Sequence, residues 1–390
     1  MKNYVKPSDL HGDSFQIVRF LKLHETNDLY VTVRFYLPRF GIDETLTIPM
    51  ADVKSSKFRD YIPPAFALEG VRTANQPDWL RSEINDALVH ATVETLLPQG
   101  FSYIENRYVY VMGNLVLNGK DLQVHTYDPL NLQLSEADRQ FPTLQPAFEW
   151  IKTFCEQGPA QCALLLCALT PFLRPVTEQL KLPARVANAY IWGQSGSGKS
   201  EFAKLVSSLS KTTAAHGVNL SCNQKTILEE LSKYRDCAFL IDDMNLTDSS
   251  HEMEKKKCRI SELIQRTHSA GKITNKGEAE IDFSRISLAV SAEYLLRNCS
   301  SLNRMIVIPM NEPFHPDALT YLQNNRRCFT QFVMIFTEYI CKYAMQLSGK
   351  VLHLLGSNEF DIHVPHENAS MYSGFQRVAC THKLLQCTRH

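Results

Sequence analysis

The chain has 390 residues, of which 44% are hydrophobic and 21% are charged, so its composition is that of a globular protein with material for two or three domains. Lysine plus arginine and aspartate plus glutamate both number 41, which excludes a global positive field as the basis of nucleic-acid binding. The 11 cysteines form no C-x-x-C pair and the N-terminus lacks the apolar core of a signal peptide, so we expect reduced thiols in a cytoplasmic protein.

Residues 1–140 are predicted to form a small mixed α/β or β-rich domain. Alternating apolar residues with many β-branched and aromatic side chains predict strands joined by turns within residues 15–48. Apolar residues at helical spacing predict a helix over residues 77–97. A strand pair is expected next in "RYVYVMGNLVL", with Gly113-Asn114 as its turn.

Residues 141–312 are predicted to form an α/β core, a parallel sheet with flanking helices. Two helices broken at Gly158-Pro159 lead into the strand "NAYIWG", and strands alternate with helices beyond it. The apolar run Cys162–Leu173 contains a proline and is too short to span a bilayer, so we expect a buried helix and no membrane contact. Residues 313–390 are predicted to form a mainly helical C-terminal region.

A glycine-rich loop, "GQSGSGKS", lies between that strand and the next predicted helix and fits the Walker A pattern G-x-x-x-x-G-K-[ST]. Backbone N–H groups of such a loop and the positive end of the helix hold phosphates, while the lysine reaches the β- and γ-phosphates and the serine hydroxyl ligates Mg²⁺. The alternative is a glycine-rich turn that happens to precede a helix. The residues expected to bind ATP are Gly193, Gln194, Ser195, Gly196, Ser197, Gly198, Lys199, Ser200 and Glu201.

An apolar strand that ends in two aspartates, "CAFLIDDMN", follows downstream and supplies the acidic partner that such a loop needs. Asp242 is the candidate for holding Mg²⁺ through water, beside Ser200, and Asp243 is the candidate for orienting the attacking water. The alternative is that both carboxylates cap the following segment. The order of elements after this strand is that of a P-loop NTPase of the ASCE or AAA+ type.

The region from about residue 75 to residue 312 resembles the helicase-like P-loop ATPases classed as domain of unknown function 927, which occur in primase-like and mobile-element replication proteins. The resemblance rests on a helical lead-in with Trp150, "WGQSGSGKS", "FLIDDMN", "HSAGK" and "SLAVSAE" followed by "SSLNRMIVI". It implies Ser291 or Glu293 at the sensor position and Arg304 as an arginine finger. The alternative for Arg304 is a surface charge that flanks a strand. Arg285 and Arg297 are rivals for the finger. Two features depart from the family: an aspartate, Asp243, stands where a glutamate is usual, and no asparagine ends the sensor strand.

Lysines on a predicted hairpin are the candidate contacts to DNA, because related hexameric helicases present a lysine there. Lys272 and Lys276 would bind phosphates without regard to sequence; a solvated turn is the alternative. The run Lys255–Lys257 with Arg259 has the same two interpretations. Four residues of the tail are of types that bind zinc, but their spacing matches no common zinc finger; these are Cys380, His382, Cys387 and His390.

The sequence therefore predicts an Mg²⁺-dependent ATPase of helicase type, a homo-oligomeric motor or remodeller that acts on nucleic acid during replication of a mobile element. The alternative is a regulatory or defence-related switch in which nucleotide occupancy controls assembly and turnover is slow. The neutral net charge and Asp243 favour the switch, whereas the predicted hairpin and Arg304 favour the motor.

Overall fold

The structure is a computed structural model. It describes residues 14–64, 76–130, 132, 134, 144–180, 186–207, 209, 217–244, 249–268, 272–273, 281–296, 301, 304–311 and 314–356. The chain divides into two compact units, the first made of Met1–Pro98 with Asp121–Tyr127 and the second of Gln99–Lys120 with Asp128–His390. Each unit is considered by itself.

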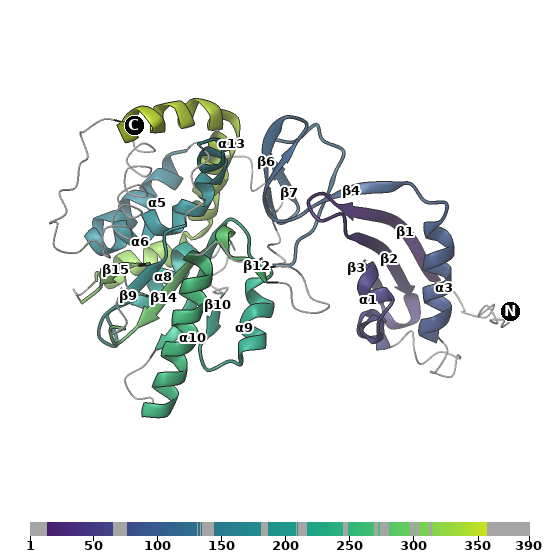
Figure 1. Ribbon diagram of the computed structural model, residues 1–390, viewed down its shortest axis with the longest axis horizontal. Helices are drawn as coiled ribbons and strands as arrows, with labels where there is room; N and C mark the ends of the chain where they lie inside the picture. The colour runs from purple at the N-terminus through teal and green to yellow at the C-terminus, as the bar shows by residue number, and fades with distance from the viewer. Residues whose placement is uncertain are drawn as a thin grey trace. The chain divides into compact units, whose positions relative to one another are not determined.

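The first unit is built on one mixed five-stranded sheet of order β3-β2-β1-β4-β8 (Figure 1). Its strands are β1 (Ser14–Leu23), β2 (Leu29–Leu37), β3 (Ile42–Pro49), β4 (Val93–Leu97) and β8 (His125–Thr126). β1, β2 and β3 pair antiparallel, whereas β4 pairs parallel with both β1 and β8. The strands expected within residues 15–48 are therefore confirmed.

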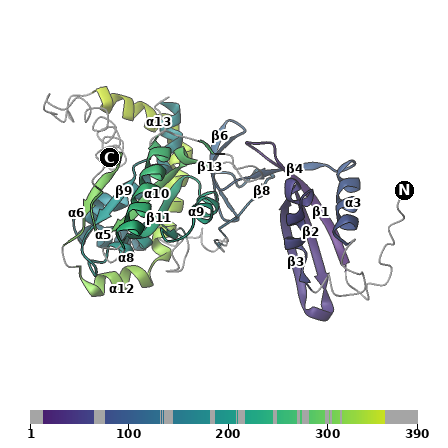
Figure 2. The same cartoon turned by 60° about the horizontal axis from the view of Figure 1, so that its bottom comes forward.

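Helix α3 (Gln76–Leu88) lies along this sheet, as Figure 2 shows, and closes its core. Its Leu80 and Ile84 are fully buried in one cluster with Phe20, Val31 and other side chains of β1 and β2. Short helices complete the unit: η1 (Pro38–Phe40), α1 (Met50–Val53) and η2 (Ser56–Tyr61). The prediction of one helix over residues 77–97 is wrong in its second half, because "VETLL" pairs with β1 as strand β4 and buries Leu96 and Leu97.

The second unit contains a five-stranded sheet of order β10-β11-β14-β9-β15 in which every pair is parallel. The strands are β9 (Ala189–Trp192), β10 (Gly217–Asn219), β11 (Cys237–Met244), β14 (Ile286–Ala292) and β15 (Ile306–Pro309). All seven residues of β14 are buried, as expected for a central strand covered on both faces. The predicted parallel sheet is confirmed, and the carboxyl ends of its strands meet at one edge.

Helices on the sheet come from both sides of β9 in the chain. They are α5 (Gln145–Glu156), α6 (Pro159–Leu169), η3 (Thr170–Leu173), α7 (Arg174–Gln179), α8 (Lys199–Ser207), α9 (Gln224–Leu231), α10 (Ser250–His268), η4 (Phe283–Arg285), α12 (Pro316–Asn324) and α13 (Arg327–Gly356). The expected break at Gly158 and the helical C-terminal region are confirmed for the described residues. Trp150 is fully buried and its indole N–H donates to the Leu322 carbonyl over 3.0 Å, which ties α5 to α12.

One segment, Pro159–Gln179, is long and apolar enough to cross a membrane, but 72% of its most apolar window is buried inside the unit. Within it, α6 ends at Leu169 and gives way to η3 and then α7. Core packing therefore accounts for its apolar composition, as the sequence predicts.

A small antiparallel sheet also belongs to the second unit: β5 (Gly100–Ile104), β6 (Arg107–Met112) and β7 (Leu115–Leu117). Its aromatic residues Phe101 and Tyr110 are buried in the same core as the parallel sheet, and β6 packs on α13. The sequence places this segment in a domain of residues 1–140 and the helical tail in a third domain. The structure divides the chain differently, because both segments share one hydrophobic core with the parallel sheet.

Candidate functional site

The glycine loop leaves the carboxyl end of β9 and enters α8, as its motif predicts. Gly196 and Gly198 have φ angles of +79° and +76°, a left-handed conformation that L-residues rarely adopt. A side chain at Gly198 would also lie 2.8 Å from the Phe314 ring. The glycines are therefore required by the turn, and the first N–H groups of α8 face the pocket that the loop borders.

Lys199 is the first residue of α8 and only 7% exposed. Its ammonium donates a hydrogen bond to the carbonyl of Gln194 within the same loop, over 2.9 Å. The side chain is thus folded back over the loop and directed at the turn around which phosphates would lie. An anion in the loop would offer this ammonium a stronger, charge-assisted partner than a neutral carbonyl.

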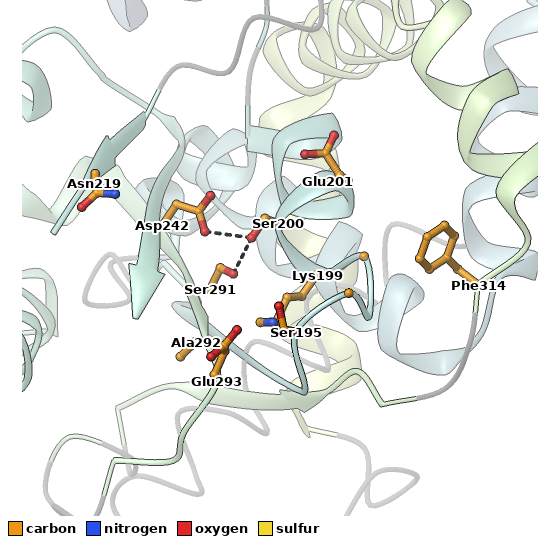
Figure 3. A pocket seen from close by; sticks show the side chains of 12 residues that line it. Ser195, Lys199, Ser200, Glu201, Asn219, Asp242, Ser291, Ala292, Glu293 and Phe314 are labelled. Atoms are coloured by element: carbon orange, nitrogen blue, oxygen red, sulfur yellow. Dashed lines mark hydrogen bonds between the residues drawn. The ribbon is translucent and has the colours of Figure 1, made fainter. Parts of the chain in front are cut away.

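Ser200, Asp242 and Ser291 converge from three different elements, α8, β11 and β14 (Figure 3). The Ser200 hydroxyl donates to Oδ1 of Asp242 over 2.8 Å and lies 2.9 Å from the Ser291 hydroxyl. Ser200 and Asp242 are the two residues that the sequence assigns to Mg²⁺, and the fold brings their oxygen atoms together although 42 residues separate them.

The three side chains border a pocket of about 460 Å³, a size typical of small-ligand sites. The lining is Ser195, Gly196, Gly198, Lys199, Ser200, Glu201, Asn219, Asp242, Ser291, Ala292, Glu293 and Phe314. The sequence interpretation missed Asn219 and Phe314. Asn219 ends β10 opposite Asp242, so recognition of "GVN" as a strand would have found it, whereas no local signal marks Phe314.

Two residues that the sequence assigns to the site, Glu201 and Ser197, make no side-chain hydrogen bond to other described residues of the glycine loop. Glu201 lines the pocket, but its carboxylate accepts from Lys204 over 2.8 Å and from Gln323 over 3.0 Å, and Figure 3 shows it directed away from Asp242. Glu201 would therefore contact a bound anion through its backbone N–H and not through its carboxylate. The buried hydroxyl of Ser197 has no hydrogen-bond partner within the part of the chain that the structure describes. Of the two sensor candidates, Ser291 contacts Ser200, and Glu293 lines the pocket beside Lys199.

Several other candidates lie outside what the structure describes. The backbone of Asp243 belongs to β11, but the position of its side chain is not described. The same holds for Lys272, whose strand β12 (Lys272–Ile273) pairs antiparallel with β13 (Ile281–Asp282), in agreement with the predicted hairpin. Lys276, Arg297 and the four zinc-type residues of the tail lie outside the described residues altogether.

The two described arginine-finger candidates, Arg285 and Arg304, differ in burial and in position. The Arg285 side chain is 4% exposed; its guanidinium donates to Asp236 and, over 2.6 Å, to the Phe101 carbonyl, so it cannot extend to another subunit. Arg304 is half-buried in the turn before β15, at the amino end of that strand. The glycine loop lies at the carboxyl end of the sheet, so Arg304 does not reach the loop of its own chain.

The basic run on α10 does not form a continuous cationic surface. Arg259 donates to the carbonyls of Leu220 and Cys222, each over 2.7 Å, and Lys256 is only 6% exposed. Lys257 pairs with Glu254 over 2.8 Å and lies over the Tyr294 ring. Arg259, Lys256 and Lys257 therefore have contacts within the unit, whereas Lys255 is exposed on the same helix.

Fold and site together define a class: an α/β protein with a parallel sheet, a glycine loop after one strand, and an acidic strand that ends beside the loop. The chain shares this fold with a helicase of known structure, the SCCmec type IV Cch active helicase, at a TM-score of 0.61 and 10% identity over 96% of this chain and 70% of that protein.

Two further solved structures are more remote. JCV helicase matches at a TM-score of 0.34 and 12% identity, over 60% of this chain and 66% of that chain. The C-terminal region of NrS-1 matches at 0.35 and 11%, over 92% and 86%. No family model and no curated protein matches the chain. The resemblance to the domain-of-unknown-function 927 ATPases therefore rests on the quoted motifs alone.

Proposed function

We propose that the protein is an Mg²⁺-dependent ATPase of helicase type. The observation that carries the proposal is the 2.8 Å contact between the Ser200 hydroxyl and the Asp242 carboxylate, at the edge of a pocket bordered by the glycine loop and Lys199. A turn that merely precedes a helix would not require a lysine, a hydroxyl and a carboxylate to converge at its mouth. The shared fold with a helicase supports the same conclusion.

The residues at the mouth fit a magnesium ion by their chemistry. Ser200 offers a hydroxyl oxygen and Asp242 a carboxylate oxygen, which are the hard ligands that Mg²⁺ prefers, and the pocket leaves room for water and phosphate oxygens. When bound, the ion would neutralise charge on the phosphates. Within the described residues no cluster of three His, Cys, Asp or Glu side chains could hold a metal by itself.

The protein groups have separate tasks in the proposed reaction. The loop N–H groups and the Lys199 ammonium would hold and orient the phosphates, and Asp243 would orient the attacking water from the strand that carries Asp242. Ser291 would fix the Ser200 hydroxyl, 2.9 Å away. An aspartate in place of the usual glutamate has a side chain one methylene shorter, so we expect slow turnover by a single subunit.

We further propose that the active form is a homo-oligomer in which Arg304 acts on the nucleotide of a neighbouring subunit. The four residues of β15 span about 13 Å and separate Arg304 from the edge that carries the glycine loop. The proposal therefore assigns Arg304 to the site of another copy of the chain and not to its own. An arginine finger supplied in trans raises phosphoryl-transfer rates by about three to five orders of magnitude.

Nucleic acid is the proposed substrate of the motor, with Lys272 and Lys276 as phosphate contacts, and replication of a mobile element is the proposed process. The β12–β13 pairing supports the hairpin on which Lys272 lies. The decisive measurement is the Mg²⁺-dependent ATPase rate with and without single-stranded DNA. A motor should be stimulated by DNA, and Lys272→Ala with Lys276→Ala should remove the stimulation while leaving the basal rate.

A nucleotide-controlled switch is the second candidate, favoured by Asp243 and the neutral net charge. It predicts tight nucleotide binding, a slow rate that DNA does not change, and an oligomeric state that differs between ATP and ADP. Sedimentation velocity in the two nucleotides would identify this behaviour. Absence of nucleotide binding under all conditions would exclude both candidates.

Shared sites can be tested by mixing two inactive variants. Arg304→Ala should lower the rate while nucleotide binding persists, and Lys199→Ala lacks the other half of the shared site. Mixed oligomers would contain some complete sites, so activity should return on mixing. No return of activity, with mixed oligomers shown to form, would exclude Arg304 as the finger.

A further inference from the structure

A second cavity of about 370 Å³ lies where the amino end of α6 meets β15. Its apolar walls come from both elements and include Pro159, Ala160, Ala163, Ile308 and Met310. α6 and β15 are in contact along this line and neighbour one another in Figure 1. β15 is an edge strand that pairs only with β9 among the described strands.

The cavity lies at the same edge of the sheet as the glycine loop. Met310 and Asn311, which follow the carboxyl end of β15, line it. The Met310 N–H donates to the Trp192 carbonyl over 2.7 Å, and a Cβ added to Gly193 would clash with the Met310 carbonyl oxygen. Met310 therefore borders the cavity and touches the first residue of the loop.

Two amide side chains lie in the cavity wall, and one of them has an unmet acceptor. Gln161 is only 5% exposed and lines the cavity. Gln157 donates to the Thr153 carbonyl over 3.1 Å, but its buried Oε1 has no hydrogen-bond partner among the described residues. Gly158 leaves room for the Gln161 amide, because a Cβ at this position would lie 3.1 Å from its Oε1. A buried acceptor without a partner is costly, so a ligand with complementary donors would stabilise it.

We propose that this cavity binds the adenine base of the nucleotide whose phosphates occupy the glycine loop. Apolar walls suit the faces of a purine, and amide side chains are the usual bidentate partners of the adenine edge. Guanine is more often recognised by arginine or lysine, and its N1–H and N2–H₂ need acceptors such as carboxylates; the described lining contains no charged side chain. The inference rests on the proposed function. It adds that the protein should prefer ATP to GTP, because the cavity suits adenine and not guanine.

The experiment compares three ligands in the presence of Mg²⁺: ATP, GTP and inorganic tripolyphosphate, each titrated calorimetrically into the full chain. The parent protein should bind ATP at least tenfold more tightly than GTP. Gln161→Ala should weaken ATP binding about two- to tenfold, the effect of one lost hydrogen bond, and leave tripolyphosphate binding unchanged. Ala163→Phe, which fills the cavity, should weaken ATP binding more. Gln145→Ala, the same chemical change on α5 outside the cavity, is the matched control.

The two proposals fail in different ways. If folded Gln161→Ala and Ala163→Phe bind ATP as the parent does, while Lys199→Ala still abolishes binding, the base lies elsewhere and the phosphate site stands. If neither ATP nor tripolyphosphate binds the parent protein, the proposed function fails and this inference fails with it. Equal weakening of ATP and tripolyphosphate by Gln161→Ala would indicate a structural role for the amide and would also overturn the base pocket.

Discussion

Strand β11 has an aspartate near each end, and the two carboxylates have opposite surroundings. Asp236, one residue before the strand, is completely buried; it accepts from Nε of Arg285 over 2.9 Å and from the Phe101 N–H over 2.7 Å. Asp242, near the other end, accepts from Ser200 and faces the 460 Å³ pocket. The same residue type therefore fixes the fold at the amino edge of the sheet and lines an open site at the carboxyl edge.

The two carboxylates differ in whether the protein itself supplies all of their partners. At the amino edge the Arg285 guanidinium matches Asp236, and Gly100 allows β5 so close that a Cβ would lie 2.5 Å from Asp236 Oδ2. No space remains there for a ligand. At the carboxyl edge short side chains converge on a cavity, so a cation or a phosphate can complete their coordination. Substitutions at the carboxyl edge should change function and leave stability unchanged. Substitutions at the amino edge should lower stability and leave function unchanged.

The largest effect is expected from Lys199→Ala at the carboxyl edge. Nucleotide binding and turnover should fall below detection, because the ammonium is the only cationic side chain among the described residues that line the pocket. The unfolding midpoint should change little, since the lysine gives up a single bond to a loop carbonyl. Titration with labelled ATP and a thermal melt measure the two quantities. Undiminished binding by the folded variant would remove the proposed site.

Asp242 and Asp243 should separate binding from hydrolysis. Asp242→Asn should weaken the Mg²⁺-dependent part of nucleotide binding, because it removes the charge beside Ser200. Asp243→Asn should keep binding and lose hydrolysis by two or more orders of magnitude, roughly the worth of a positioned base. A rate equal to the parent's in Asp243→Asn would show that the water is oriented by another group, of which Glu293 in the pocket lining is the nearest acidic alternative.

The opposite result is expected at the amino edge from Asp236→Asn. Asparagine suits the left-handed φ of +51° at this position, so the backbone should stay while Arg285 loses its counter-charge. Breaking a buried ion pair should cost about 3 kcal/mol of unfolding free energy, measured by urea denaturation. Glu254→Gln, in the exposed pair with Lys257, should cost less than about 1 kcal/mol. Lost ATP affinity in the remaining folded Asp236→Asn protein would contradict the division between the edges.

The smallest effect concerns two thiols, one near each edge. Burial raises the pKa of the Cys237 thiol to about 12, so only about one molecule in ten thousand carries the reactive thiolate at pH 8. Cys222, three residues beyond Asn219, is half-buried. Iodoacetamide should therefore modify Cys222 well before Cys237 in the folded protein, as peptide mass spectrometry would show. Equal rates would mean that the amino edge opens as readily as the carboxyl edge.

Those parts of the site that depend on local order could be predicted from the amino-acid sequence. The motif "GQSGSGKS" requires positive φ at two glycines and a helix after them, and "FLIDD" is a buried strand that ends in carboxylates; both are local properties. Because the strands of a parallel sheet end at one edge, these two motifs implied the contact between Ser200 and Asp242. The alternation of strands and helices across the second unit followed from the same periodicities.

Features that depend on distant partners became visible in the folded chain alone. "VETLL" forms a strand because it pairs with β1. Gln99–Lys120 belongs to the second unit, where the Phe101 N–H donates to Asp236, 135 residues further along the chain. The same buried network removes Arg285 from the finger candidates. Residue type and spacing predict what a segment can form, but burial depends on which other segment covers it. The packing of the whole unit decides which segments cover one another, so local sequence patterns could not predict this burial.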